Sequence, residues 1–284
     1  MRTLFVTDLD GTLLGPDRKV SAESVGMINE AIAEGAMFSV ATARTPATVG
    51  PLLDDVDSPL PFIVMTGAAI WNREDNRYVY AAFHREETAK RLVELYRRHR
   101  LSAFIYILGD DNVIHIYHIG DMSDLEREFM EERLHTPYKD FHILDREEGQ
   151  LPERLDKVLL FYSMRPEEEV RRVHDEIKDS DDLRAVFYHD MYGDEIALME
   201  VFGQEASKAN AVRRLAEMVG AERIVAYGDN INDIPILEVA DDAVAVANAV
   251  EAARLAAGRV IGPNNEDSVA KDIKKQTKML KNLD

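Results

Sequence analysis

The order of apolar segments predicts an α/β fold with a parallel sheet, interrupted by an inserted α+β module. Short apolar segments typical of buried strands lie at 3–8, 37–42 and 62–66, and helical patterns lie at 21–34 and near 47–53. Such alternation is typical of βαβ units. Between 84 and 189 the pattern changes to alternating strands and hairpin signals, and it changes back after 190. The sequence therefore predicts a discontinuous core, 1–83 and 190–284, around a domain at 84–189.

The elements of the core have recognisable ends. Ser21 is a good helix cap and Gly35 a good helix stop. Residues 70–82 are expected to form a hairpin at the edge of the core. After the insertion, the chain is expected to return to the core with a strand at 196–202, a helix at 207–219 and a strand at 224–227.

The inserted section is predicted to be an antiparallel sheet that carries helices. Its predicted helices are 86–98, 123–134 and 166–178, and its predicted strands are 102–108, 113–119, 157–164 and 183–189. The turn at 109–112 is a hairpin signal. The junctions at 82–84 and 189–193 are the expected hinges.

The first strand ends in two carboxylates one residue apart, Asp8 and Asp10, followed by Gly11. Alternate residues share a face of a strand, so both side chains project at its carboxyl end, where parallel sheets place their sites. Such close carboxylates repel each other unless a cation or a shared proton intervenes. This suggests Mg²⁺ and a division between nucleophile and acid. The alternative is a strand that ends in an ordinary Asp-Gly turn.

Three more motifs follow in order. Thr42 ends an apolar segment, Lys208 begins a helix, and Gly228-Asp229-Asn230-Ile231-Asn232-Asp233 follows a strand. With D-x-D-G-T at 8–12, they resemble the motifs of the haloacid-dehalogenase-like (HAD) hydrolase superfamily. The segments 243–249 and 264–270 resemble elements of its Cof-type branch. The resemblance implies a Rossmann-like core and a C2B-type cap at 84–189.

The resemblance also implies roles for these residues. Asp8 would be the nucleophile that forms an aspartyl-phosphate, and Asp10 the general acid and base, with Thr42 and Lys208 completing the catalytic set. Mg²⁺ would be held by Asp8, the backbone carbonyl of Asp10, and Asp229. The residues implied to contact the phosphate are Gly11, Thr12, Thr42, Ala43, Arg44, Lys208 and Asn232, and those implied to orient the shell around them are Asn230 and Asp233.

Each of these residues also has an ordinary interpretation. Taken alone, Lys208 would be a surface lysine, Thr42 a strand-end hydroxyl and Asp229 a helix cap. The sequence also departs from the family pattern. Ala43, Ala209, Ala247 and Ser268 stand where the family has glycine, and Thr66 stands where it has asparagine. These departures concern contacts to substrate more than the catalytic carboxylates.

Composition excludes several classes of protein. There is no cysteine among the 284 residues, which excludes cysteine-based phosphatases, thiolate zinc sites and disulfides and fits a cytoplasmic protein. No apolar run is long enough for a membrane span, and the first residues are expected to form a strand rather than a signal peptide. The net charge of −19 argues against nucleic acid as a partner.

The eight histidines all lie between 84 and 189, so the motif-bearing sections contain no histidine nucleophile or base. His115 and His118 are three residues apart in a predicted strand, and they therefore point to opposite faces and should not form a metal pair. For the motif-bearing sections, a mechanism that uses carboxylates and a metal ion is the simplest one that remains.

The sequence as a whole predicts a Mg²⁺-dependent phosphomonoester hydrolase for small phosphorylated metabolites. Sugar phosphates are the first expectation, followed by flavin, pyridoxal and nucleotide phosphates, with selectivity assigned to the inserted module. The alternatives are a phosphomutase of the same superfamily and a non-catalytic protein that binds phosphorylated metabolites. The sequence does not indicate an oligomeric state.

Overall fold

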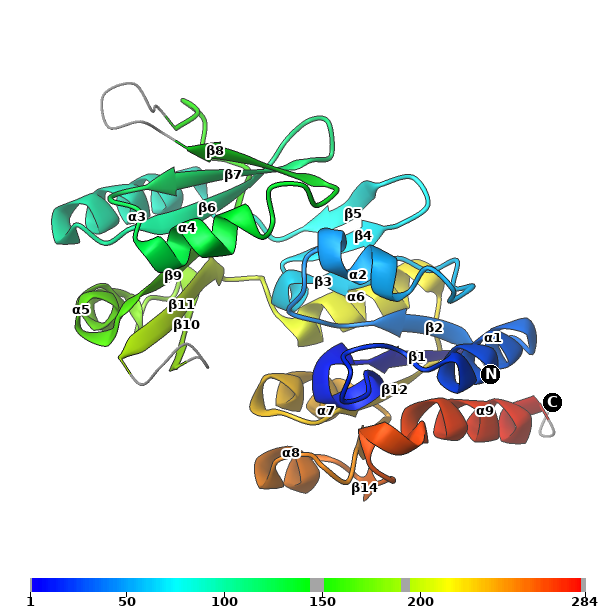
Figure 1. The fold of residues 1–284 in the computed structure, drawn as a ribbon. Helices are drawn as coiled ribbons and strands as arrows, with labels where there is room; N and C mark the ends of the chain where they lie inside the picture. Colours follow the sequence, from blue (N-terminus) through cyan, green and yellow to red (C-terminus); the bar gives the residue numbers. More distant parts are fainter. Residues whose placement is uncertain (1, 144–150, 190–194, 282–284) are drawn as a thin grey trace. The chain divides into compact units, whose positions relative to one another are not determined.

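The computed structural model describes residues 2–143, 151–189 and 195–281. The chain divides into two compact units (Figure 1). The core unit comprises Met1–Tyr80 with Ser207–Asp284, and the inserted unit comprises Ala81–Ala206. The fold is α/β as predicted, with a parallel sheet in one unit and a largely antiparallel sheet in the other.

The core unit contains a five-stranded parallel sheet in the order β14-β13-β12-β1-β2. Its strands are β1 (Thr3–Thr7), β2 (Met37–Val40), β12 (Arg223–Gly228), β13 (Asp242–Ala245) and β14 (Arg259–Val260). Every residue of β1 is buried, as expected for the middle of a parallel sheet with both faces covered. The carboxyl ends of β1 and β12 consequently lie side by side.

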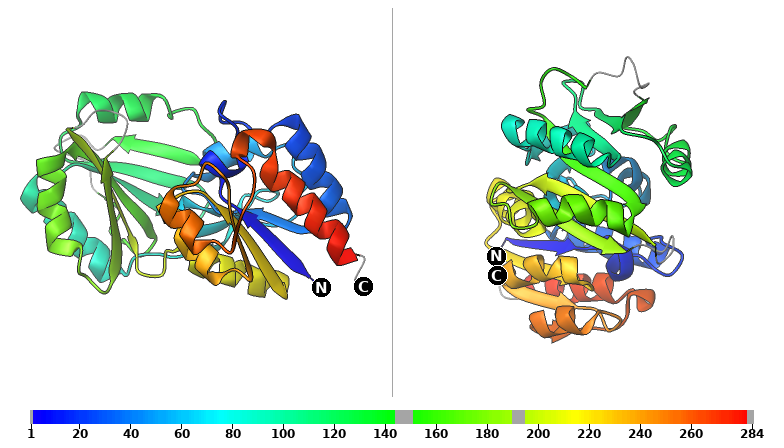
Figure 2. Two further views of the ribbon diagram at one scale, coloured as in Figure 1. Left: turned by 90° about the horizontal axis from the view of Figure 1, so that it is seen from below. Right: turned by 90° about the vertical axis from the view of Figure 1, so that its left-hand side faces the viewer.

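Helices of the core unit pack in two groups. α1 (Ala22–Ala33) and α9 (Ser268–Lys281) lie against each other, as Figures 1 and 2 show. α7 (Ile234–Val239) packs against α6 (Lys208–Val219), α8 (Glu251–Ala256) and β12. α2 (Pro46–Leu52) follows β2. The predicted cap of α1 is confirmed, because the Ser21 hydroxyl accepts a hydrogen bond from the Ser24 N–H.

A small sheet of β3 (Phe62–Val64), β4 (Ala69–Asn72) and β5 (Arg77–Ala81) extends the core unit, which includes the predicted hairpin. β3 was expected in the parallel sheet, but its ladder is with β4, antiparallel. A single bridge between Ala41 and Ile63 joins it to the end of β2. The Thr42 N–H also donates to the Ile63 carbonyl at 3.0 Å. The prediction of a buried strand was right, and its main partner was not foreseen.

The inserted unit contains a six-stranded sheet in the order β10-β11-β9-β6-β7-β8. Its elements are α3 (Glu86–His99), β6 (Ala103–Leu108), β7 (Ile114–Ile119), α4 (Asp124–Glu131), β8 (Lys139–Ile143), β9 (Val158–Pro166), α5 (Glu167–Ile177), β10 (Leu183–His189) and β11 (Ile196–Gly203). α3 and α5 supply apolar residues to one buried cluster with alternate residues of β6 and β11. β8 was not predicted, and it pairs with β7 in parallel.

The strand predicted at 196–202 was assigned to the wrong sheet. As β11 it lies between β10 and β9 in the inserted unit, antiparallel to both. Ala197, Met199 and Val201 belong to the apolar cluster under α3 and α5, which explains why the strand stays in this sheet. The inserted unit therefore ends at Ala206 rather than at the predicted 189.

His84, the last residue of the predicted hinge at 82–84, packs within the inserted unit. The His84 N–H donates to the Val158 carbonyl at 2.8 Å, and its Nε2 lies 3.0 Å from the Val201 carbonyl oxygen. Burial lowers the pKa of His84 to about 4, so the ring is neutral at pH 7. The second predicted hinge, 189–193, lies outside the described residues except for His189.

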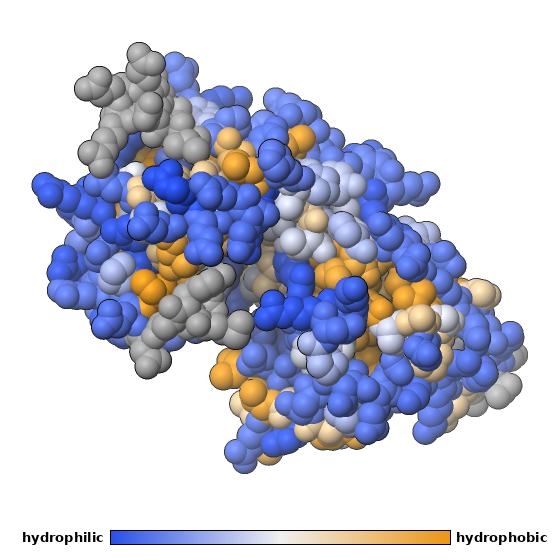
Figure 3. Space-filling view, viewed as in Figure 1, coloured by the Kyte–Doolittle hydropathy of each residue, from blue (hydrophilic) through white to orange (hydrophobic). Residues whose placement is uncertain are grey.

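The face of the molecule seen in Figure 3 is mostly hydrophilic, with hydrophobic residues in scattered groups. This agrees with the large negative charge of the chain. Among the residues that the structure describes, no helix combines the length and apolar character needed to cross a membrane.

A fully buried carboxylate fixes α4 to the sheet of the inserted unit. Glu126 accepts hydrogen bonds from the Ser102 hydroxyl and from the N–H and hydroxyl of the helix cap Ser123. His118 and Arg165 each approach its carboxylate to 3.5 Å. Burial alone raises the pKa of Glu126, but these donors outweigh burial and hold the pKa below its ordinary value.

Replacing Glu126 with Gln should destabilise the inserted unit by about 1–3 kcal/mol at pH 7, because buried donors lose a charged acceptor. Since the folded pKa is lowered, the stabilisation is complete above the unfolded pKa of about 4.3 and disappears as pH falls through the folded pKa. Urea unfolding between pH 7 and pH 3 measures both effects. Glu128→Gln, an exposed change on the same helix, is the matched control. Equal stability of E126Q and parent at pH 7 would contradict the assigned role.

Candidate active site

A buried ammonium group lies between two carboxylates at the carboxyl end of β1. Lys208, the first residue of α6, donates from Nζ to Asp8 Oδ1 and to Asp233 Oδ1, each at 2.6 Å. The Lys208 side chain is 1% exposed, and the side chains of Asp8 and Asp233 are 8% and 0% exposed. Lys208 is therefore not an ordinary surface lysine.

Asp229 completes the cluster from the neighbouring strand, since it follows β12, which pairs with β1. Carboxylate oxygens of Asp8, Asp229 and Asp233 lie within 4.8 Å of one another. The Thr12 hydroxyl donates to Asp229 Oδ1 at 2.7 Å. The structure thus brings together residues of the first, third and fourth motifs.

The charges of this cluster do not balance, because three carboxylates surround one ammonium group. Burial raises the pKa of Asp8, with Lys208 opposing the shift and Asp233 adding to it. Burial likewise raises the pKa of Asp229. For Lys208, burial alone would lower the pKa, but Asp8 and Asp233 outweigh it and raise the pKa, so the amine stays protonated. Excess negative charge on oxygen donors fits a hard divalent cation such as Mg²⁺.

Both carboxylate oxygens of Asp233 accept hydrogen bonds from neighbouring residues. Its Oδ1 accepts from Lys208, and its Oδ2 accepts from the backbone N–H groups of Asp229 and Asn230 at 3.0 and 3.1 Å. These contacts leave Asp8 and Asp229 as the carboxylates with oxygens to offer a metal ion. Outer contacts of this kind hold ligands in place.

The carboxylate of Asp10 is turned to Arg44. Arg44 donates from Nε to Asp10 Oδ2 at 2.7 Å and from its terminal nitrogen to Oδ1 at 2.6 Å, a bidentate pair. The Asp10 side chain is 51% exposed. The hydrogen bond with Asp10 raises the pKa of Arg44. Arg44, predicted to contact phosphate, is therefore paired with the predicted acid in this structure.

The turn after Asp8 is held by asparagines that the sequence analysis did not single out. Asn248 donates from its side chain to the Gly11 carbonyl at 2.8 Å, and Asn264 to the Leu14 carbonyl at 2.7 Å. Gly11 has φ +80°, and a Cβ there would lie 2.5 Å from an Asp229 oxygen. Asn248 lies in the segment 243–249 and Asn264 in the segment 264–270. The resemblance of these two segments to Cof-type elements was the only sequence feature that pointed to the asparagines.

A turn with strained backbone, 65–67, contacts both the second motif and the residue before Lys208. Met65, Thr66 and Gly67 all have positive φ, and the Thr66 N–H donates to the Thr42 carbonyl at 3.0 Å. A Cβ at Gly67 would lie 2.3 Å from the backbone of Ser207, directly before Lys208. Left-handed backbone is unfavourable for a β-branched residue and easier for asparagine, which gives the family's asparagine at this place a physical reason.

The remaining predicted residues differ in their exposure and contacts. Thr42 is buried, and its hydroxyl accepts from the Arg44 N–H at 3.2 Å. Asn230 accepts from the Ile231 N–H with its side chain. Ala43 and Asn232 are exposed. Among the described residues, Asn232 has no hydrogen bond to the cluster, so its predicted phosphate contact stays a prediction.

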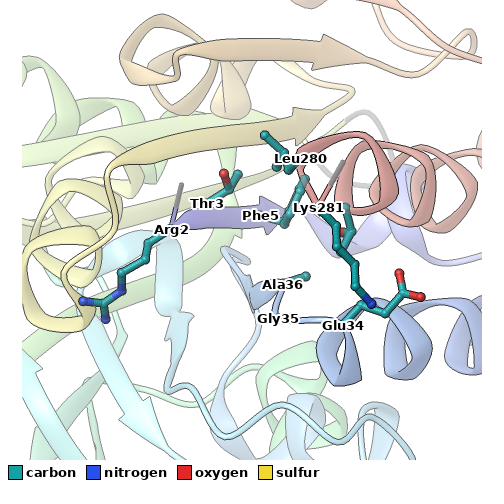
Figure 4. A pocket seen from close by; sticks show the side chains of 9 residues that line it. Arg2, Thr3, Phe5, Glu34, Gly35, Ala36, Leu280 and Lys281 are labelled. Atoms are coloured by element: carbon teal, nitrogen blue, oxygen red, sulfur yellow. The ribbon is translucent and has the colours of Figure 1, made fainter. Parts of the chain in front are cut away.

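A separate pocket lies at the opposite end of β1. Its lining includes Arg2, Thr3, Glu34 and Lys281, and Figure 4 shows these side chains around the start of the strand. None of the predicted site residues lines it. This pocket is therefore not part of the candidate site, which lies at the carboxyl end of the sheet.

The chain matches the family of haloacid dehalogenase-like hydrolases over residues 5–273, and it belongs to that family. Its relatives include the 5-amino-6-(5-phospho-D-ribitylamino)uracil phosphatase YitU of Bacillus subtilis, 25% identical over 95% of this chain and 96% of that protein. Pyridoxal phosphate phosphatase YbhA of Escherichia coli is 25% identical over 95% of this chain and 97% of YbhA. The predicted class, a HAD-type phosphatase, is confirmed.

Solved structures show the same fold. A haloacid dehalogenase-like hydrolase from Bacteroides thetaiotaomicron superposes with a TM-score of 0.75 at 21% identity, over 97% of this chain and all of that one. The HAD subclass IIB sugar phosphatase BT4131 superposes with a TM-score of 0.70 at 20% identity, over 97% and 99%. The predicted combination of a parallel-sheet core with an inserted α+β unit is confirmed.

Replacing Gly67 with Ala should lower both stability and activity. The added Cβ must displace the backbone before Lys208, and alanine disfavours a φ of +86°, so we expect a loss of about 1–3 kcal/mol or more. Thermal unfolding and turnover of a phosphate ester measure the two effects. Gly26→Ala is the control, because nothing lies within 4 Å of its Cβ position in α1, and it should stabilise by about 0.5–1 kcal/mol. Unchanged melting and turnover in G67A would contradict this role.

Proposed function

We propose that this phosphatase hydrolyses phosphate monoesters of small metabolites in a Mg²⁺-dependent reaction, through an aspartyl-phosphate on Asp8. The observation that carries the proposal is the buried Lys208 ammonium, which contacts Asp8 and Asp233 beside Asp229. A carboxylate attacks a phosphate dianion only where positive charge offsets their repulsion. Lys208 provides one such charge at the nucleophile itself.

Asp8 is the proposed nucleophile because it projects from the central strand and contacts Lys208. In the first step an Asp8 oxygen bonds to phosphorus, and the ester oxygen leaves with a proton. In the second step water attacks the phosphorus, and inorganic phosphate departs from Asp8. Asp8 and Asp229 would hold Mg²⁺, which would supply further positive charge to the phosphoryl oxygens.

Asp10 is the proposed proton donor in the first step and acceptor in the second. In the structure both of its carboxylate oxygens accept hydrogen bonds from Arg44. We propose that Asp10 leaves Arg44 when substrate binds, and that the freed guanidinium contacts the phosphoryl oxygens. This exchange would reconcile the observed pair with the phosphate contact predicted for Arg44.

Small phosphorylated metabolites are the proposed substrates, with sugar phosphates the first candidates. YitU and YbhA are named for a phosphoribityl compound and for pyridoxal phosphate, so both belong in a test panel. The groups described at the core site serve a phosphoryl group and a metal ion, so we assign discrimination among leaving groups to the inserted unit. The proposal includes a cytoplasmic location, which suits a chain without cysteine.

Replacing Asp8 with Asn should reduce phosphate release by on the order of 10³-fold or more, because the amide is a poor nucleophile of similar size. Release of inorganic phosphate from p-nitrophenyl phosphate and from a metabolite panel, with and without Mg²⁺, measures the loss. Acid quenching with labelled substrate should trap labelled protein in the parent only. Asp54→Asn, an exposed change in the same unit, should have no effect. Substantial turnover by D8N would exclude Asp8 as nucleophile.

Asp10→Asn should slow turnover by about 10²-fold or more, since the amide neither donates nor accepts the proton. The loss should be smaller for p-nitrophenyl phosphate than for an alkyl phosphate, because nitrophenolate leaves without protonation. Comparing the two substrates in parent and variant measures this difference. An equal loss for both substrates would instead indicate that Asp10 acts by positioning Arg44.

A further inference from the structure

Two imidazole rings face each other on neighbouring strands of the inserted unit. His115 of β7 and His142 of β8 place Nδ1 and Nε2, respectively, 2.9 Å apart. The strands pair in parallel, with Tyr117 opposite His142 and His115 opposite Asp140. His118, in contrast, packs against Phe104 and Glu126, so the expected separation of His115 from His118 holds. The partner of His115 is a residue that the sequence did not indicate.

Each ring is held by a second contact. His115 Nε2 lies 3.4 Å from the Asp111 carboxylate, on the side of the ring away from His142. The His142 ring stacks on Tyr117, with centroids 4.6 Å apart and planes inclined by 17°. Both histidines stand on strands rather than on loops. The pair is therefore oriented before any ligand arrives.

We propose that His115 Nδ1 and His142 Nε2 bind a divalent transition-metal ion such as Zn²⁺, at a site separate from the carboxylate cluster of the core unit. Tetrahedral bonds of about 2.0–2.1 Å place two imidazole nitrogens about 3.3–3.4 Å apart. The observed separation of 2.9 Å requires a movement of only about half an ångström. Water fills the other coordination positions.

The chemistry of the donors favours this class of ion. Imidazole suits Zn²⁺, Cu²⁺ and Ni²⁺, whereas the oxygen donors of the core site suit Mg²⁺, and the chain has no cysteine to compete. The Asp111 contact favours the His115 tautomer with the proton on Nε2 and a lone pair on Nδ1, an arrangement common for metal-bound histidine. His142 binds with its proton on Nδ1. Asp140 lies opposite His115, and its charge favours a cation nearby.

A metal ion at this place would join β8 to the rest of the sheet. In the described part of the inserted unit, β8 is the last strand of the sheet order and pairs with β7 alone. The ion would bridge the two strands through side chains on one face. The site would therefore stabilise an edge that otherwise depends on the backbone ladder.

Calorimetric titration of the full chain with Zn²⁺, in excess Mg²⁺ to fill the carboxylate cluster, tests the proposal. The parent should bind one Zn²⁺ per chain, and both His115→Gln and His142→Gln should lose that ion. His135→Gln, an exposed change in the same unit, should retain it. Asp111→Asn should bind at least about tenfold more weakly, because the orienting carboxylate is lost.

Nitrogen-15 NMR of the parent imidazoles gives a readout that needs no variant. Zn²⁺ should shift the resonances of His115 Nδ1 and His142 Nε2 and leave those of His135 in place. The proposal is overturned if the parent binds no Zn²⁺ beyond the carboxylate cluster. It is also overturned if H142Q binds as the parent does, or if the two imidazoles show no shift at saturation. In those cases the contact is only a hydrogen bond between the two imidazole rings.

Discussion

The pairing of the buried Lys208 ammonium with Asp8 and Asp233 is the interaction on which the core unit depends. It joins Asp8 from the first strand, Asp233 from the turn after β12, and the start of α6. Burying a charge is costly unless its partners are close, and removing one partner leaves the others unpaired. Asp8 lies 200 residues from Lys208 and Asp233 only 25, and Lys208 follows the whole inserted unit. The core can therefore complete its charge pairing only after the chain returns from the insertion.

Local patterns were sufficient to predict most elements, and they failed where a choice of sheet was needed. The ends of α1 and the hairpin of β6 and β7 follow from capping and turn residues. β11 is an apolar run that fits either sheet, and its place between β10 and β9 is decided by packing under α3 and α5. β8 was missed because its sequence, Lys-Asp-Phe-His-Ile, is largely polar, as an edge strand permits.

The candidate site was predictable where a residue type and its place on an element suffice. Asp8, Asp229 and Lys208 each stand at a strand end or helix start, and the structure brings them together. The pair of Arg44 with Asp10 joins residues that face each other only in the folded core, so no spacing could indicate it. The hydrogen bond from Asn248 to Gly11 spans most of the chain and was hidden for the same reason.

The unbalanced charge of the site links metal and substrate. With three carboxylates and one ammonium group, the cluster repels a phosphate dianion, and the net charge of −19 adds no long-range attraction. A divalent cation at Asp8 and Asp229 would cancel the excess of two negative charges. Since coupling between two ligands is reciprocal, a substrate that binds better with the cation also holds the cation more tightly. In their proposed role as metal ligands, these carboxylates would thus both hold the cation and repel a phosphate group when the cation is absent.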